Sequence, residues 1–268
     1  MIYKQVRVNI AVGEERDILL AVLADAGFEG FEETDDMLCA CVPEGNMGAE
    51  DIAALLQGYQ FSVEDVAQRN WNAEWESSFD PVIVDGYCTV RAHFHDVDVT
   101  TPYCIVITPQ MSFGTGHHAT TQLMLAGMSR LPLQGARVFD FGTGTGVLGI
   151  LAAMSGAASV MATDNDEWAV NNALDNVKRN GVVMEVALTE ELPSGSFDVV
   201  LANINRHILL HYMAGLYAVC SPGAKLLMSG LLVADEEMVK DEAVKQGFIH
   251  LATDTLNGWI SILVEKPL

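Results

Sequence analysis

The feature that most constrains the fold is a regular alternation of strand-like and helix-like segments that begins at Leu133. Short apolar runs such as ARVFDF, SVMATD and FDVVLANI alternate with longer segments in which apolar residues recur at helical spacing. This order predicts an α/β, Rossmann-like domain with a mostly parallel sheet and helices on both faces. The final segment predicts a hairpin that turns at Leu256–Gly258 and supplies antiparallel edge strands.

The first part of the chain predicts a separate and smaller α+β domain. Residues 1–67 contain strand-like alternation and two helical segments in the order β-α-β-β-α-β. That order is typical of a ferredoxin-like sandwich. We therefore predict one domain at 1–67 and a larger one at 81–268. Within the larger domain, 81–132 contribute entry strands and a helix, and 133–268 form the core sheet.

Residues 68–80 predict a linker helix between these two domains. Trp71, Trp75 and Phe79 recur at four-residue intervals, which places three aromatic side chains on one helical face. We expect this face to pack on a neighbouring domain, and a partner-binding stripe is the alternative.

The composition limits the classes of partner. With 14 basic and 36 acidic residues, the formal net charge is −22, which repels phosphate backbones and argues against direct nucleic-acid binding. The same charge attracts a basic partner, although many cytoplasmic proteins are simply acidic. Five cysteines without a CxxC pair indicate free thiols in a reducing compartment. The N-terminus lacks a signal-peptide pattern and no apolar run is long enough to span a bilayer, so we expect a cytoplasmic protein without membrane contact. We also expect a monomer.

The glycine-rich segment FDFGTGTGVLG, residues 139–149, leaves an apolar strand and enters a helix. In open α/β sheets ligands bind at the carboxyl ends of the strands, and glycines such as Gly142 and Gly144 let a ligand approach the backbone. The glycines formally match the GxGxxG dinucleotide pattern, but a carboxylate at Asp140 would oppose a pyrophosphate. S-adenosylmethionine suits that carboxylate better, because it has a positive sulfonium, a free amino group and no phosphate. We therefore predict S-adenosylmethionine as cofactor, with Asp140, Gly142 and Gly144 in contact with it.

Two further strand ends carry candidate site residues. Asp164 ends the next strand, at a position where a carboxylate can accept both hydroxyl groups of a ribose. Asn203 and Ile204 close the strand FDVVLANI. The side-chain carbonyl of Asn203 and the backbone carbonyl of Ile204 can accept the protons of an amine and aim its lone pair at the methyl group, so that catalysis is mainly positioning. The alternative for Asn203 is to cap the helix that starts near Arg206.

The histidine pairs do not predict a metal site. His93 and His95 form an HxH that we interpret as one face of a plain strand, and no third ligand is evident nearby. His117 and His118 are adjacent, so their side chains point in different directions on a helix and cannot easily bind one ion. We expect no metal.

Six segments also carry a resemblance to a known family. They are NWNAEWESSFDPVIV, MSFGTGHHATT, FDFGTGTGVLGI, ATDNDEWAVNNALDNVKRN, VVLANI and LMSGLL. Together they resemble the bacterial ribosomal protein L-eleven methyltransferase family, and the likeness extends from Trp71 to Trp259. The FGTGxHxTT motif is the specific part, because the glycine loop alone is typical of any class I methyltransferase.

The resemblance implies a Rossmann-like class I methyltransferase domain with a mostly parallel seven-stranded sheet, preceded by a ferredoxin-like domain that recognises the ribosomal protein. It implies methylation of lysine ε-amino groups and of the N-terminal α-amino group of that protein. Carried over by motif, the cofactor contacts fall on Thr121, Gly142, Asp164 and Asn203, with Thr120 as the alternative to Thr121.

The resemblance also assigns a role to the first FGTG segment, which we expect to fold over the glycine loop. Phe113 is then placed to line the channel by which the amine reaches the methyl group. We expect His118 to orient the turn, and deprotonation of lysine is the alternative. One departure from the family is Asn205, where members often have leucine, and this leaves the substrate preference open.

Three functions remain open from the sequence. The first is methylation of the ribosomal protein, and the second is the same chemistry on a different protein or a small molecule. The third is a binding module that kept the fold without the activity, because fold does not fix function.

Overall fold

The computed structural model describes residues 2–34, 36–43, 45–67, 81–108 and 119–268. The chain divides into two compact units, residues 1–78 and 79–268. The predicted linker helix at 68–80 lies outside the described residues, so it and the predicted domain bounds stay predictions.

The first unit is built around a four-stranded sheet in the order β2-β3-β1-β4, and its described strand pairs are antiparallel. Its elements are β1 (Ile2–Asn9), α1 (Glu14–Asp25), β2 (Glu29–Glu33), β3 (Met37–Pro43), α2 (Ala49–Leu55) and β4 (Phe61–Ala67). Leu23 of α1 and Ile52 of α2 belong to one buried cluster with Val6, Val8 and Leu38 of the strands. Both helices therefore pack on the same face of this sheet. The element order is the one expected from the sequence, and the assignment to the ferredoxin-like fold stays a prediction.

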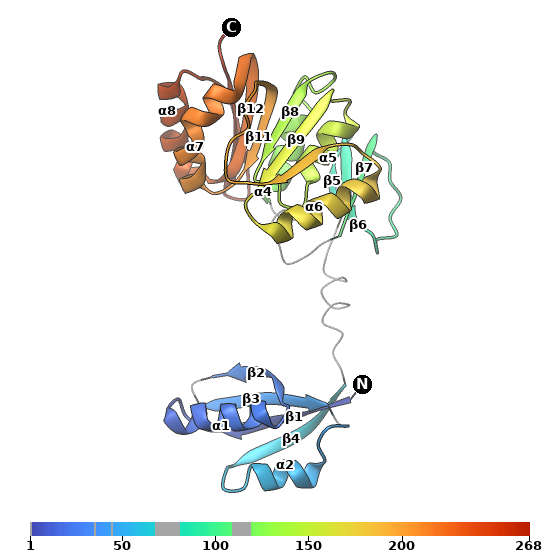
Figure 1. The fold of residues 1–268 in the computed structure, drawn as a ribbon, viewed down its shortest axis with the longest axis vertical. Coiled ribbons are helices and arrows are strands. Elements are labelled where there is room, and N and C mark those ends of the chain that lie inside the picture. Colours follow the sequence, from blue (N-terminus) through green and yellow to red (C-terminus); the bar gives the residue numbers. More distant parts are fainter. Residues whose placement is uncertain (1, 35, 44, 68–80, 109–118) are drawn as a thin grey trace. The chain divides into compact units, whose positions relative to one another are not determined.

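The second unit contains a seven-stranded sheet in the order β10-β9-β8-β11-β12-β14-β13. The first five strands run parallel, and the terminal hairpin adds β14 and β13 in antiparallel pairing. The predicted α/β fold class is confirmed (Figure 1). The elements after the first helix, α4 (Ala119–Met128), are β8 (Arg137–Phe141), α5 (Val147–Met154), β9 (Ser159–Asp164), α6 (Glu167–Asn180), β10 (Glu185–Leu188), β11 (Phe197–Asn203), α7 (Arg206–Val219), β12 (Cys220–Leu232), η1 (Val233–Asp235), α8 (Glu236–Gln246), β13 (Ile249–Leu256) and β14 (Trp259–Glu265).

Helices cover both faces of this sheet, because its central strands are apolar on both sides. In β11, Val199 and Leu201 join the buried cluster of α4 and α5, whereas Val200 and Ala202 join that of α7 and α8. Figure 1 shows α7 and α8 on one side of the strands and α5 and α6 on the other. Among the described residues, no helix has both the length and the apolar character needed to cross a bilayer.

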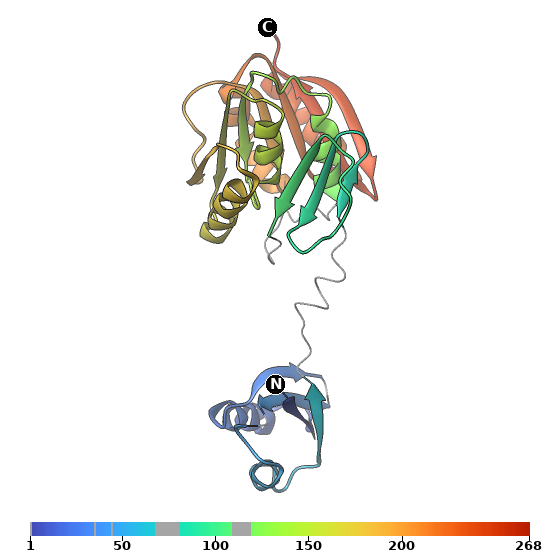
Figure 2. The same ribbon diagram turned by 90° about the vertical axis from the view of Figure 1, so that its right-hand side faces the viewer.

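A smaller three-stranded sheet packs into the same core as α4 and α5. It contains β5 (Val82–Val84), β6 (Cys88–Ala92) and β7 (Tyr103–Ile107) in that order. Figure 2 shows these strands, coloured teal, beside the larger sheet. These are the predicted entry strands, and β7 leads directly toward the FGTGHH segment.

The interpretation of His93 and His95 as part of a strand was wrong. β6 ends at Ala92, and both histidines follow it in a turn region. In this turn the His95 N–H donates to the Ala92 carbonyl at 3.2 Å, and the Ala92 N–H donates to His95 Nδ1 at 3.1 Å. The Arg91 guanidinium also donates to the His95 carbonyl at 2.8 Å.

Candidate functional site

The predicted site residues gather where the strand order reverses. β8 lies between β9 and β11, so the chain crosses from one half of the sheet to the other at this point. Ligands of open α/β sheets bind outside the carboxyl ends of the strands at such a reversal. Asp140 and Gly142 leave β8 here, Asp164 ends β9, and Asn203 ends β11.

The loop after β8 is shaped by glycines in the left-handed region of backbone space. The φ angles of Gly142, Gly144 and Gly146 are 72°, 56° and 81°. Glycine adopts such angles readily, whereas residues with a side chain rarely do. Four backbone N–H groups of the loop donate to acceptors within the protein at 2.9–3.0 Å, namely those of Gly142, Thr143, Gly144 and Gly146. A pyrophosphate cradle needs such groups free to face the ligand. A ligand can therefore come close to the backbone of this loop, but few backbone N–H groups remain to bind an anion.

Asp140 lies beneath this loop and holds it in place. Its side chain has no exposed surface, and its Oδ2 accepts the Thr143 hydroxyl at 2.6 Å and the Gly149 N–H at 3.1 Å. Burial raises the pKa of Asp140 to about 6, against the opposing effect of these two bonds. Its Oδ1 is buried and has no hydrogen-bond partner among the described residues. The structure thus shows a loop anchor with one unsatisfied oxygen, and direct contact with a cofactor stays a prediction.

Asp164 is half-buried at the end of β9, beside the loop. Its Oδ2 accepts the Gly144 N–H at 2.9 Å and its Oδ1 accepts the Asp166 N–H at 3.1 Å. These two bonds fix the carboxylate against the glycine loop. Each carboxylate oxygen has more than one lone pair, so acceptor capacity remains for the hydroxyl groups of a ribose.

The structure brings Asn203 and Thr121 together across 82 residues of sequence. Asn203 Nδ2 lies 3.5 Å from the Thr121 hydroxyl oxygen, to which it donates. Thr121 is 1% exposed in the first turn of α4, and Asn203 and Ile204 are half-buried. Because the amide nitrogen is turned toward Thr121, the Asn203 carbonyl oxygen is left for another donor. Phe113 and His118 lie outside the described residues, so their channel and turn roles stay predictions.

Asn205 caps α7, and Asn203 does not. Asn205 Oδ1 accepts the Ile208 N–H at 3.2 Å, which satisfies one of the unpaired donors of the helix terminus. The capping alternative for Asn203 was therefore wrong. This bond also explains the departure at Asn205, since an asparagine caps a helix better than a leucine.

A row of asparagines on α6 was not predicted from the sequence. Asn172, Asn176 and Asn180 recur every four residues and bind the edge of β7. Asn180 accepts the Val106 N–H at 2.8 Å and donates to the Val106 carbonyl at 2.7 Å. Asn176 accepts the N–H of Thr108 at 2.8 Å. These side-chain amides thus make the hydrogen bonds that a neighbouring strand would make at the edge of β7. The i, i+4, i+8 spacing was the signal in the sequence that could have indicated them.

Asn176 also reaches the glycine loop. It is fully buried, and its Nδ2 donates to the carbonyl of Thr145 at 2.9 Å and to Asn172 Oδ1 at 2.7 Å. One side chain thereby joins the glycine loop to Thr108, the last described residue before the FGTGHH segment.

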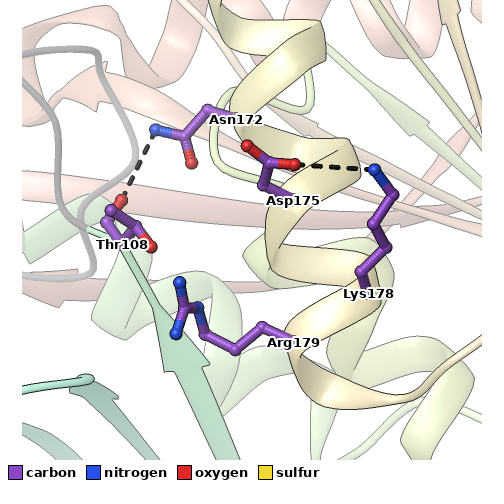
Figure 3. Close-up of a pocket in the computed structure, with 5 residues that line it drawn as sticks. All are labelled: Thr108, Asn172, Asp175, Lys178 and Arg179. Carbon is purple, nitrogen blue, oxygen red and sulfur yellow. Dashed lines mark hydrogen bonds and ion pairs between the residues drawn. The ribbon is translucent and has the colours of Figure 1, made fainter.

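Figure 3 shows a pocket of about 460 Å³ between α6 and the residue that follows β7. It is lined by Thr108, Asn172, Asp175, Lys178 and Arg179. Asn172 points toward Thr108, and the Asp175 carboxylate pairs with Lys178 at 3.7 Å (Figure 3). None of the predicted site residues lines this pocket, so we place the functional site at the strand reversal and not here.

The residues at the strand reversal fit a cationic ligand better than a phosphate or a metal. Two carboxylates flank the glycine loop, one of them with an unsatisfied buried oxygen, and most loop donors are already used. Within the described ranges no three His, Cys, Asp or Glu side chains are grouped so as to hold a metal ion. The donor set therefore suits a ligand with a positive group and a ribose, as S-adenosylmethionine has.

Comparisons with known proteins agree with this chemistry. A family model described as Ribosomal protein L11 methyltransferase (PrmA) matches residues 25–267. A protein of Porphyromonas gingivalis named ribosomal protein L11 methyltransferase is 38% identical over 92% of this chain and 89% of its own length. The crystal structure of a ribosomal protein L11 methylase from Lactobacillus delbrueckii subsp. bulgaricus superposes with a TM-score of 0.65 and 25% identity, and the match covers 70% of this chain and 98% of that chain. A 16S rRNA methyltransferase of T. thermophilus, in complex with AdoMet and guanosine, shares the fold with a TM-score of 0.50 and 18% identity over 60% of this chain and 46% of its own.

Proposed function

Because the chain belongs to the ribosomal protein L11 methyltransferase family, we propose that it methylates lysine ε-amino groups and the N-terminal α-amino group of ribosomal protein L11. The family resemblance inferred from the sequence is confirmed by these matches. The chain is a methyltransferase that depends on S-adenosylmethionine. One observation supports an amine as substrate. Asn203 ends β11 and Ile204 follows it, so two neutral carbonyl groups lie at the end of the strand that pairs with β8.

The proposed cofactor contacts come from four places in the second unit. Gly142 and Gly144 let the cofactor lie against the loop backbone, and the Asp164 carboxylate accepts its ribose hydroxyls. Asn203 ends β11, on the other side of β8 from Asp164, and its amide group donates a hydrogen bond to Thr121. When bound, S-adenosylmethionine supplies a methyl group already activated by the positive sulfur, so the chain needs to supply mainly orientation.

The proposed role of Asn203 and Ile204 is to hold the neutral amine. Asn203 Oδ1 and the Ile204 carbonyl oxygen accept its N–H groups and leave its lone pair free. Neutral carbonyl groups cannot take up a proton, so a substrate ammonium loses its proton to water before the reaction. The pKa of about 10.4 for lysine and about 8 for an α-amino group then set how much neutral amine is present.

The charge of the first unit supports a basic protein substrate. Residues 1–67 contain 14 acidic and three basic residues, a net charge of −11, which is half of the total in a quarter of the chain. Such a surface attracts a basic protein and speeds its encounter. We propose the cytoplasm as the location, since none of the five cysteines, all of which the structure describes, forms a disulfide. A monomeric state stays a prediction.

The test is mass mapping of purified ribosomal protein L11 after incubation with the protein and isotope-labelled S-adenosylmethionine. We expect labelled methyl groups on lysine side chains and on the N-terminal amine. A matched control is L11 whose amino groups have been chemically blocked, which should take up no label. If unblocked L11 also takes up none while a cell extract does, the substrate is a different protein or a small molecule.

A further inference from the structure

Gly230 interrupts β12 beside the proposed amine site. Its φ is +86°, within a strand that otherwise runs from Cys220 to Leu232. The pairing of β12 with β14 is irregular between Met228 and Leu231, which brackets this glycine. A glycine inside a strand marks a bulge or a close approach of another backbone.

The neighbour that approaches Gly230 is the peptide of Ile204. A Cβ added at Gly230 would lie 2.1 Å from the Ile204 carbonyl oxygen, 2.7 Å from its carbonyl carbon and 3.0 Å from its nitrogen. These are backbone atoms, so a side-chain rotation cannot relieve the clash. The register of β11 and β12 gives the reason. Asn203 pairs with Ser229, so the residues that follow them, Ile204 and Gly230, come to lie opposite each other.

Ile204 is confined on a second side by Gly142. A Cβ at Gly142 would lie 2.4 Å from Ile204 Cγ2, so the isoleucine side chain fills the space that this glycine leaves open. Its side chain thus rests against the glycine loop and its carbonyl against β12. Two glycines therefore confine Ile204, one in the loop after β8 and one in β12, the strands on either side of β11.

We propose that Gly230 is a positioning residue for methyl transfer, which keeps the Ile204 carbonyl oxygen where it accepts an N–H of the substrate amine. This inference rests on the proposed role of Ile204. Any larger residue at position 230 displaces that oxygen or fills the space in front of it. A displacement of about 1 Å at a reacting centre lowers the rate about 100-fold.

The test compares Gly230→Ala with Gly258→Ala in the full chain. Gly258 has a φ of +81°, close to that of Gly230, but a Cβ there would meet no atom within 4 Å. Both variants therefore place a side chain at a similar positive φ, and only the Cβ of Gly230→Ala meets Ile204. The measurements are kcat and KM for L11, the dissociation constant for S-adenosylmethionine and the urea unfolding transition.

For Gly230→Ala we expect kcat to fall roughly 10- to 100-fold, with little change in cofactor affinity and a cooperative unfolding transition whose midpoint lies below that of Gly258→Ala, because the added Cβ meets backbone atoms. For Gly258→Ala we expect the kcat of the unsubstituted protein. Equal kcat values in the two variants overturn the inference. So does a Gly230→Ala protein that loses cofactor binding or its unfolding transition, because the effect is then not local to the carbonyl. If the unsubstituted protein transfers no methyl group to L11, the proposed function itself fails and this inference falls with it.

Discussion

Replacing Asp140 with asparagine should remove a loss of folding stability that the original protein undergoes as the pH rises. Asp140 is fully buried, and burial raises its pKa to about 6, from the ordinary value of 3.8 for an aspartate. An asparagine oxygen can still accept the bonds from Thr143 and Gly149 that hold the loop. The substitution therefore removes the ionisation and keeps the geometry.

The sign follows from the raised pKa of the folded state. The contribution of Asp140 to stability is fully present below the unfolded pKa near 4, and it is lost as the pH rises through about 6. The whole difference corresponds to about 3 kcal/mol, of which about 2 kcal/mol falls between pH 4.5 and pH 7.5. The free energy of unfolding of Asp140→Asn, relative to the original protein, should rise by about that amount over this interval.

Hydrogen exchange of the amides in β8 and α5 measures the stability of the unit that contains Asp140. A useful control is Asp198→Asn, because the hydrogen bond from Arg137 lowers the pKa of Asp198. Asp198 therefore stabilises the fold above its unfolded pKa, and its replacement should show a small effect of opposite sign, since the pair is exposed and screened. If the difference between Asp140→Asn and the original protein is the same at pH 4.5 and pH 7.5, the reasoning about this carboxyl group is wrong.

Three further predictions concern catalysis, cofactor binding and the asparagine row. For lysine substrates, kcat/KM should rise about tenfold per pH unit between pH 7 and pH 9, because the amine loses its proton to water; a flat profile from stopped assays would instead indicate a base within the protein. Asp164→Asn should weaken S-adenosylmethionine binding roughly 10- to 100-fold in calorimetry, since hydrogen bonds to a charged acceptor contribute about 1.5–3 kcal/mol, and unchanged affinity would exclude a ribose contact. Asn176→Ala should lower the free energy of unfolding by about 2–3 kcal/mol, because it removes the hydrogen bonds that this side chain makes to the Thr108 N–H and the Thr145 carbonyl. The control Asn171→Ala, on the exposed face of α6, should have little effect on it.

Much of the second unit could be predicted from the sequence, because its periodicity is strong. The helix expected over Glu167–Asn180 has those bounds in the structure, and the hairpin turns at Leu256–Gly258 as expected. β10 (Glu185–Leu188) was not recognised, since it is a four-residue edge strand without an apolar alternation. Short elements whose side chains are not sorted into buried and exposed faces leave no periodic signal.

The candidate site could be located from the sequence, but its internal contacts could not. Glycines and carboxylates at strand ends indicated where a ligand binds. The capping alternative for Asn203 failed even though α7 begins at Arg206 as expected, because the residue directly before the first helical residue is Asn205. The approach of Gly230 to Ile204 arises from the register between β11 and β12, which the sequence of neither strand contains.

The most direct test of the account is kcat for methyl transfer to ribosomal protein L11 by Asn203→Ala and Asn205→Ala. Asn203 is the proposed amine acceptor, whereas Asn205, two residues away, caps α7. We predict that Asn203→Ala lowers kcat about 100-fold, and that Asn205→Ala keeps kcat and loses about 1 kcal/mol of stability. A full kcat in Asn203→Ala, or an equal loss in both variants, would contradict the assignment of the amine site to this strand end.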